Sequence, residues 1–301
     1  MKFALYTVSK RLLSMGTRSN SFLTSDGVRL NWLEAGDGTP LVMLPGWSQS
    51  AALFREQFKG LSDHMRCIAL DHRGHGESDK PEHGYRINRL ARDLQEFITY
   101  CNLEGIVMMG HSMGSSVIWS YIESFGTKRL SGLVIDDQPA AMTLPNYESK
   151  DSLKESGAIF PWEILNTTCS SLVDKDGTDF TRKMIENMLS TQITKADKEW
   201  IINENLKLPR RHAATLLFNH SVQDWRDTIS TIRVPVLIIS GEESVVPPES
   251  QRWIQSQIEG SILEIFASNQ GGHHFAFLEN PEKFNFILRQ FIDGLKGKSD
   301  A

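Results

Sequence analysis

Residues 110–114 read Gly-His-Ser-Met-Gly and place Ser112 between an apolar run and a stretch with a helical pattern. A serine on such a tight strand-to-helix turn sits in strained backbone that lifts its hydroxyl clear of the sheet. The glycines at 110 and 114 are expected because side chains there would collide with the neighbouring strand and helix. The start of the helix also directs N–H groups toward developing negative charge. The pattern therefore predicts a nucleophilic Ser112, with the N–H of Met113 forming half of an oxyanion hole.

A serine hydroxyl is a poor nucleophile at neutral pH and needs a base within hydrogen-bond reach. The chain has nine histidines. His273 and His274 are the two that follow the last expected strand, where the loop returns to the end of the sheet that carries Ser112. These two residues are the candidates for the base.

Short apolar runs and helical patterns alternate along the chain that positions these side chains. After a hairpin at 22–33, strands are expected at 40–44, 67–70, 106–109, 133–135, 235–239 and 261–266, with helices such as 90–100 and 281–295. Continuous apolar strands that alternate with helices are typical of a parallel sheet buried on both faces. We therefore predict an α/β fold with a mostly parallel central sheet covered by helices on both faces.

The character of the chain changes between residues 140 and 227, where helical periods dominate and aromatic residues and methionines recur. This segment is expected to form a helical cap inserted over the carboxyl edge of the sheet. The predicted core comprises residues 22–139 and 228–298, and residues 1–21 are expected to form a flexible arm.

Composition excludes several kinds of partner. At 301 residues with a net charge of -5, the chain has no basic excess that would favour nucleic acid. No apolar run approaches the roughly 20 residues that a membrane helix needs. The three cysteines are scattered without a CxxC pair, which argues against a disulfide framework or a zinc site. We expect a small-molecule substrate, no metal and no cofactor, and the sequence leaves a homodimer open.

The first residues carry Lys2, Lys10, Arg11 and Arg18, with no acidic residue before position 26. Mitochondrial transit peptides share this composition. A loose arm on a cytoplasmic protein is the favoured interpretation, and a mitochondrial location is the alternative.

Motifs in a consistent order make the chain similar to the α/β-hydrolase superfamily over residues 22–295. They are the Leu-Pro-Gly-Trp turn at 44–47, Asp-His-Arg-Gly-His-Gly-Glu-Ser at 71–78, the serine turn at 110–114, and His-Phe-x-x-Leu-Glu-x-Pro from His274. The resemblance implies that His274 is the base and His273 a neighbour. It also implies that the backbone N–H of Trp47 is the second oxyanion donor. Trp47 is expected to line the substrate pocket, and Trp162 is a weaker candidate for it.

The acid of the triad departs from the commonest pattern of this superfamily. Ser244 occupies the position where many relatives carry an aspartate, and a hydroxyl cannot offset imidazolium charge as a carboxylate does. Branches such as haloalkane dehalogenases, some lactonases and cofactor-free dioxygenases carry the acid after an earlier strand, where Asp136 and Asp137 stand here. Because neighbouring side chains point to opposite faces, strand register decides between them. The hydrolase register favours Asp137, and a dioxygenase-like register would select Asp136. Glu242 and Glu243 are outside candidates.

Two further groups of polar or aromatic residues are expected to be structural. His72, Arg73 and His75 resemble a metal or anion cluster, but the family pattern makes this stretch a loop that organises the sheet edge. His220 and Trp225 resemble packing or hinge elements where the cap rejoins the core.

The leading functional prediction is a serine hydrolase that cleaves a small, rather apolar carboxylic ester or lactone through a Ser-His-Asp triad and an acyl-enzyme. A similar arrangement carries the label non-haem haloperoxidase in related sequences. The alternative is a cofactor-independent dioxygenase in which a His-Asp dyad deprotonates an aromatic substrate. That branch has additional histidines where this chain has Met113 and Gln49. A binding protein without catalysis is disfavoured because Ser112 and His274 are both present.

Overall fold

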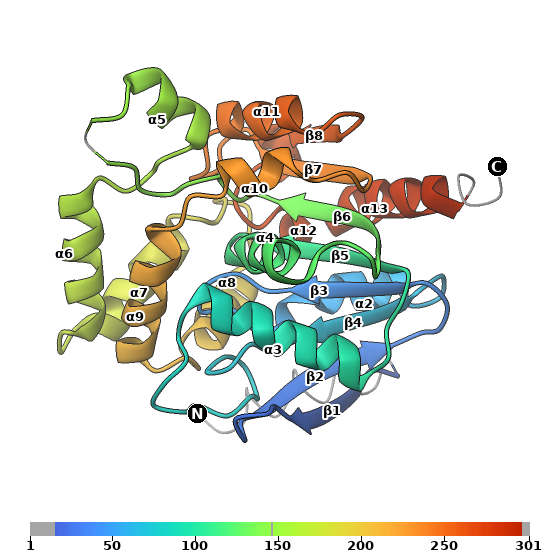
Figure 1. The fold of residues 1–301 in the computed structure, drawn as a ribbon. Coiled ribbons are helices and arrows are strands. Elements are labelled where there is room, and N and C mark those ends of the chain that lie inside the picture. Colours follow the sequence, from blue (N-terminus) through green and yellow to red (C-terminus); the bar gives the residue numbers. More distant parts are fainter. Residues whose placement is uncertain (1–15, 146, 297–301) are drawn as a thin grey trace.

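The computed structural model describes residues 16–145 and 147–296 and contains one eight-stranded sheet (Figure 1). The strand order is β1-β2-β4-β3-β5-β6-β7-β8. Only the pairings β1–β2 and β2–β4 are antiparallel, and the remaining neighbours are parallel. The bounds are β1 Arg18–Leu23, β2 Arg29–Ala35, β3 Pro40–Leu44, β4 Arg66–Leu70, β5 Ile106–His111, β6 Leu130–Asp136, β7 Val236–Gly241 and β8 Ile262–Phe266.

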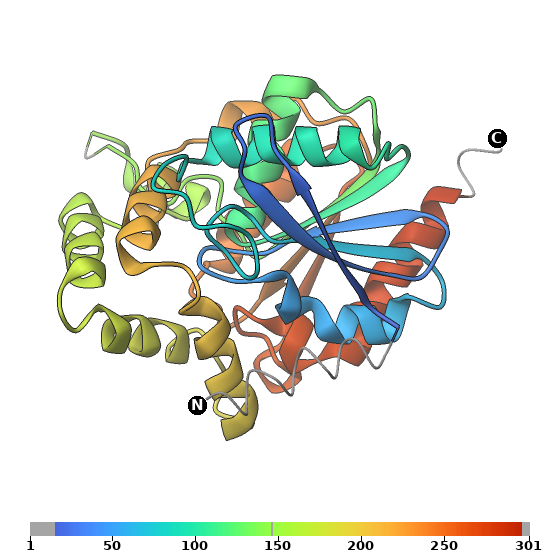
Figure 2. The ribbon, with the colours of Figure 1, turned by 90° about the horizontal axis from the view of Figure 1, so that it is seen from below.

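Both faces of the sheet are buried, and alternate residues of each strand enter different cores. In β3, Val42 and Leu44 join one apolar cluster, whereas Leu41 and Met43 join the other. This alternation follows from the two-residue period of a strand. The first face is covered by α3 (Ile87–Tyr100), α4 (Met113–Phe125), α10 (Arg226–Ser230) and α11 (Pro248–Gln257). The other is covered by η1 (Ala51–Phe54), α2 (Arg55–Leu61), α12 (Ala276–Glu279) and α13 (Pro281–Lys296) (Figure 2). The predicted fold class is therefore confirmed.

The six strands expected after the hairpin all occur, and their ends lie within three residues of the expected ones. β5 continues through His111, so it ends directly before Ser112. β6 begins at Leu130 and ends at Asp136, so Asp136 belongs to the strand and Asp137 follows it. This register decides where the two aspartates point.

Residues 18–21 belong to the sheet and not to a flexible arm. The sequence predicts a flexible arm at 1–21, but Arg18 to Ser21 pair with Glu34 to Asn31 as the outer strand of the sheet. Residues 1–15 lie outside the described part of the chain, so a transit-like segment and the cellular compartment stay predictions. No helix among the described residues combines the length and apolar character needed to cross a bilayer.

Five helices lie between β6 and the short α10 and form the helical insertion. They are α5 (Lys150–Ser156), α6 (Trp162–Val173), α7 (Gly177–Glu186), α8 (Lys195–Asn205) and α9 (Arg210–Ser221). The two ends of the insertion lie together: Ala141 forms an antiparallel bridge with Asp224, and the N–H of Trp225 donates to the carbonyl of Ala140 at 3.0 Å. Figure 1 shows α5, α6, α7 and α9 gathered at one end of the sheet.

Candidate active site

Ser112 lies on the turn between β5 and α4 in a backbone conformation that side chains rarely adopt, with φ 50° and ψ -127°. Its N–H donates to the carbonyl of Asp136 at 2.8 Å, which ties the turn to the end of β6. A Cβ on Gly110 would strike the backbone of Ser115, and a Cβ on Gly114 would strike the carbonyl oxygen of Leu44. Both glycines are therefore required by close approach, and the strained turn is fixed from both sides.

His274 follows β8 and is 4% exposed. Its Nδ1 lies 2.7 Å from Oδ2 of Asp137. Asp137 is itself buried directly after β6, with φ 55°, and it accepts further hydrogen bonds from the hydroxyls of Ser240 and Ser244. The carboxylate thus holds the imidazole in one orientation and fixes Nδ1 as the nitrogen that carries the proton.

Two glycines allow the loops after β7 and β8 to meet behind His274. A Cβ on Gly241 would strike the carbonyl of Gly272, and a Cβ on Gly272 would strike the carbonyl of Phe266. The N–H of Glu243 donates to the carbonyl of Gly272 at 2.8 Å. This contact sets the loop that carries Ser244 against the loop that carries His274.

The side chain of Asp136 contacts His111 and makes no hydrogen bond with His274 in the described part of the chain. Its Oδ2 lies 3.0 Å from Nδ1 of His111, and both side chains are buried. Burial, and then the charge of Asp137, raise the pKa of Asp136 well above its usual value. Burial lowers the pKa of His111 well below its usual value. His111 is therefore a neutral imidazole at pH 7, and burial favours the protonated form of Asp136.

The remaining acid and base candidates lie outside the pocket. Nε2 of His273 is 3.5 Å from Oε2 of Glu243. Glu242 accepts a hydrogen bond from the N–H of Ser268 at 2.9 Å. The structure therefore brings His274 and Asp137 together and does not bring these other residues to Ser112.

The expected oxyanion donors flank Ser112. Met113 is the first residue of α4, so its N–H has no acceptor within the helix. A Cβ on Gly46 would lie 3.0 Å from Cβ of Ser112, which shows how closely the turn before Trp47 approaches the serine. Within the described residues, the backbone N–H of Trp47 has no hydrogen-bond acceptor.

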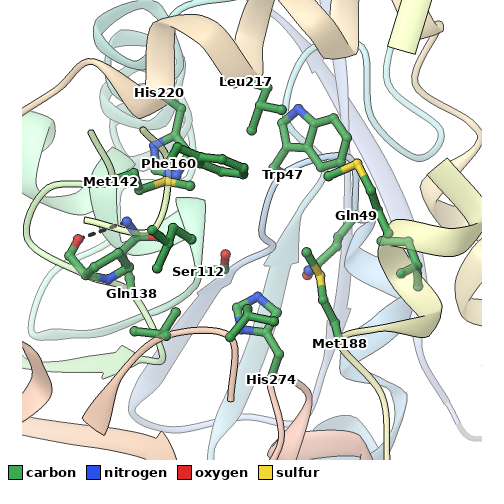
Figure 3. Close-up of a pocket in the computed structure, with 16 residues that line it drawn as sticks. Trp47, Gln49, Ser112, Gln138, Met142, Phe160, Met188, Leu217, His220 and His274 are labelled. Atoms are coloured by element: carbon green, nitrogen blue, oxygen red, sulfur yellow. Dashed lines mark hydrogen bonds between the residues drawn. The ribbon is translucent and has the colours of Figure 1, made fainter. Parts of the chain in front are cut away.

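Ser112 and His274 both line one cavity (Figure 3). Over the residues that the structure describes, no hydrogen bond joins Oγ of Ser112 to the imidazole. Such contacts are often long in sites without a ligand and tighten when substrate binds. Most of the lining is apolar: Trp47, Pro139, Met142, Ile159, Phe160, Met184, Ile185, Met188, Leu217, Val245 and Val246.

The prediction that Trp162 lines the pocket is wrong. Trp162 begins α6 after Pro161 and its side chain is 38% exposed, outside the lining. Phe160, two residues earlier, enters the cavity instead. Sequence reasoning also missed His220, which was assigned to packing but lines the cavity from α9. The recurrent aromatic residues and methionines of the insertion were a signal for the lining, but periodicity does not say which of them turn inward.

The loop at residues 71–78 holds the turn next to Ser112 in place through hydrogen bonds of His75. Nε2 of His75 accepts a hydrogen bond from the N–H of Ser48 at 3.2 Å, and its Nδ1 lies 2.9 Å from the carbonyl of Arg73. Burial lowers the pKa of His75 to about 3, so the ring is neutral. His75 therefore holds the turn that carries Trp47. Across the described ranges, no cluster of three or more His, Cys, Asp or Glu side chains is suited to a metal ion.

Comparison with known proteins agrees with this architecture. The sequence profile of the alpha/beta hydrolase fold matches residues 39–281. The chain belongs to the alpha/beta hydrolase family. The AB hydrolase superfamily protein YisY of Bacillus subtilis is 27% identical to this hydrolase-fold chain over 278 residues, which cover 89% of the chain and 97% of YisY.

Solved structures share the fold of this alpha/beta hydrolase. A bromoperoxidase from Bacillus anthracis superposes with a TM-score of 0.83 at 21% identity, covering 92% of this chain and 100% of that one. The esterase EaEST from Exiguobacterium antarcticum superposes with a TM-score of 0.80 at 24% identity, covering 91% of this chain and 99% of the esterase. At these identities the likeness supports the fold, and the reaction has to be argued from the site.

Proposed function

We propose that this alpha/beta hydrolase is a serine hydrolase that cleaves a small, rather apolar carboxylic ester or lactone. One observation carries the proposal: Ser112 shares an apolar cavity with His274, and Asp137 holds the imidazole of His274 through Nδ1. An apolar lining suits a neutral substrate with few fixed charges. The esterase among the structural neighbours agrees with this reaction class without establishing it.

The proposed reaction begins when Oγ of Ser112 bonds to the carbonyl carbon while Nε2 of His274 takes the hydroxyl proton. The carbonyl oxygen becomes an oxyanion, stabilised by the N–H groups of Trp47 and Met113. The tetrahedral intermediate then expels the alcohol oxygen, which takes the proton from His274. An acyl-enzyme on Ser112 remains.

Water completes the cycle on the same groups. His274 takes a proton from a water molecule as the water oxygen bonds to the acyl carbon, and the second tetrahedral intermediate releases the carboxylic acid. Ser112 recovers its proton from His274. Throughout, the Asp137 carboxylate orients the ring and offsets the charge of the imidazolium.

Covalent labelling tests the nucleophile. A fluorophosphonate should add one phosphonyl group to the wild type, seen as an increase in intact mass, with loss of turnover of a short 4-nitrophenyl ester. Ser112→Ala should be neither labelled nor active. Ser116→Ala, a buried serine one turn further along α4, is the matched control and should be labelled normally. Undiminished labelling or turnover of Ser112→Ala would reject the mechanism, and a wild type without either would favour a reaction such as cofactor-independent oxygenation.

A further inference from the structure

His220 enters the cavity from α9 as a polar group that the proposed reaction does not use. Its side chain is 2% exposed and lines the cavity with Met142, Phe160 and Leu217. In Figure 3, the imidazoles of His220 and His274 approach the cavity from opposite sides of Ser112. His220 is therefore placed to contact a part of the substrate remote from His274.

Neither ring nitrogen of His220 has a hydrogen-bond partner within residues 16–145 and 147–296. A buried polar group without a partner costs about 1–3 kcal/mol, and native proteins seldom leave one without a reason. Its cavity neighbours Met142, Phe160 and Leu217 are apolar, and another apolar residue could have matched them. A ligand that supplies the missing partner would explain why a histidine stands here.

The charge of His220 follows from its burial. Desolvation lowers the pKa of the ring to about 3, so it is neutral at pH 7 and offers one N–H donor and one acceptor nitrogen. Nδ1 is enclosed by protein without a partner, and Nε2 is the nitrogen that keeps access to the cavity. An unsatisfied buried N–H is rarer than an under-satisfied acceptor. Because an unpaired acceptor is the more common of the two, the enclosed Nδ1 is expected to be the acceptor. The proton is then on Nε2, and this N–H faces the cavity.

Two other side-chain donors of the lining are already engaged. Nε1 of Trp47 donates to the carbonyl of Ala213 at 2.8 Å, and Nε2 of Gln138 donates to the carbonyl of Pro139 at 2.9 Å. Nε2 of Gln49 is a further donor, but it lies beside Gly46 near Ser112, where Oε1 of Gln49 accepts from the N–H of Gly46. His220 thus offers a donor on the side of the cavity formed by the helical insertion.

We propose that Nε2 of His220 donates a hydrogen bond to a second oxygen of the substrate, which selects esters or lactones that carry a neutral keto, ether or hydroxyl oxygen besides the scissile group. The inference rests on the proposed hydrolase function and names its substrate class. A carboxylate is not the expected group, because the ring is uncharged and the described lining contains neither lysine nor arginine.

The test compares esters that differ only in one oxygen. One panel is 4-nitrophenyl heptanoate with analogues in which a single chain methylene is replaced by oxygen, and a second panel carries the oxygen in the alcohol part. In the wild type, at least one oxygen-containing ester should exceed its hydrocarbon parent in kcat/KM by about tenfold, which one hydrogen bond supplies. Absence of any such preference in both panels would overturn the proposal.

The ratio of the two kcat/KM values is the readout for variants, because it cancels general effects on rate. In His220→Phe the ratio should fall to about one, and His220→Gln, whose amide can donate, should recover part of it. Leu217→Met, on the same helix and lining, is the control for altered packing and should keep the preference. An unchanged ratio in His220→Phe would overturn the proposal.

Binding to Ser112→Ala separates this inference from the hydrolase proposal. Calorimetric titration with matched dialkyl ketones, with and without an ether oxygen, needs no turnover. The oxygen-containing ketone should bind about tenfold more tightly to Ser112→Ala, and the preference should vanish in Ser112→Ala/His220→Phe. A preference without ester turnover by the wild type would reject the hydrolase function alone. Equal binding of the two ketones would reject the role of His220.

Discussion

Ser244 donates a hydrogen bond to the carboxylate oxygen of Asp137 that also meets Nδ1 of His274. Ser244 stands where many relatives carry the acid of the triad. In this chain it is a hydrogen-bond partner of Asp137, which lies beside His274 instead. Ser240 donates to the other oxygen of the same carboxylate at 3.2 Å. Hydroxyl donors of this kind hold the carboxylate in place beside the imidazole.

Asp137→Asn should reduce kcat by about 10³–10⁴-fold, because an amide no longer fixes the proton on Nδ1 of His274 or offsets the imidazolium charge. Asparagine tolerates the positive φ of this position, so the fold should persist. Asp136→Asn is the matched control. Its amide can still form a hydrogen bond with Nδ1 of His111, so kcat should stay within about threefold of the wild type. Steady-state kinetics with a short aryl ester measure both, and equal losses in the two variants would refute the assignment.

Because Ser244 lies close to His274, we predict that an aspartate at position 244 can replace Asp137 as the acid of the triad. In Asp137→Asn/Ser244→Asp, the new carboxylate starts from a side chain that already reaches the oxygen bonded to Nδ1. We expect kcat to recover at least about tenfold over Asp137→Asn, since a carboxylate again faces the imidazole. Asp137→Asn/Ser240→Asp is the control, because Ser240 faces the other carboxylate oxygen and its variant should recover less. No gain at position 244 would show that the loop cannot present a carboxylate to the ring.

The candidates for the contact between His274 and an aspartate were predictable from local order, but the sequence left the choice between Asp136 and Asp137 open. The serine turn and the glycine-rich loop before His274 are short motifs, and the choice between neighbouring aspartates follows from the side-chain period of β6. Asp136 ends the strand and turns toward His111, whereas Asp137 begins the loop. Strand residues are constrained by two neighbouring strands, so their register is strongly specified.

The lining contributed by the helical insertion was not predictable in the same way. The orientation of α6 and α9 depends on how these helices pack against each other and on the sheet, not on their own sequence period. Trp162 and Phe160 are two residues apart, yet only Phe160 enters the cavity. The sequence predicts a packing role for His220. A single histidine on an apolar helix face does not show whether its side chain is packed in the core or faces a cavity.

Two helical glycines should respond in opposite directions to alanine. In Gly114→Ala, the new Cβ would strike the carbonyl of Leu44, so unfolding free energy should fall by about 1–3 kcal/mol and activity should be lost as the turn at Ser112 shifts. In Gly294→Ala, on α13, the Cβ meets no atom within 4 Å. Stability should therefore rise, by up to about 1 kcal/mol, through helix propensity. Urea denaturation measures both, and a tolerated Gly114→Ala would contradict the close approach seen here.

Two buried ionisable groups, His220 and Asp136, should affect the pH dependence of stability in opposite directions. Removing each group should therefore change the slope of unfolding free energy against pH with opposite sign. Between about pH 4.5 and 6.5, His220 binds a proton in the unfolded chain but not in the folded one, because burial lowers its pKa to about 3. Its contribution to stability is therefore lost as the pH falls through this window. Asp136 has a pKa raised well above its usual value, so above that usual value the folded protein retains a proton that the unfolded chain has lost. Its contribution is lost as the pH rises.

Removing each group should change the slope of unfolding free energy against pH by up to one proton, roughly 1.4 kcal/mol per pH unit. His220→Phe should show a smaller increase of stability with pH than the wild type, and Asp136→Asn a larger one. Urea denaturation at about pH 5 and about pH 6 gives both slopes. The comparison between variants cancels the shared contributions of other buried groups such as His72, whose pKa is lowered to about 4. Slopes that move together in the two variants would mean that the protonation states inferred for His220 and Asp136 are wrong.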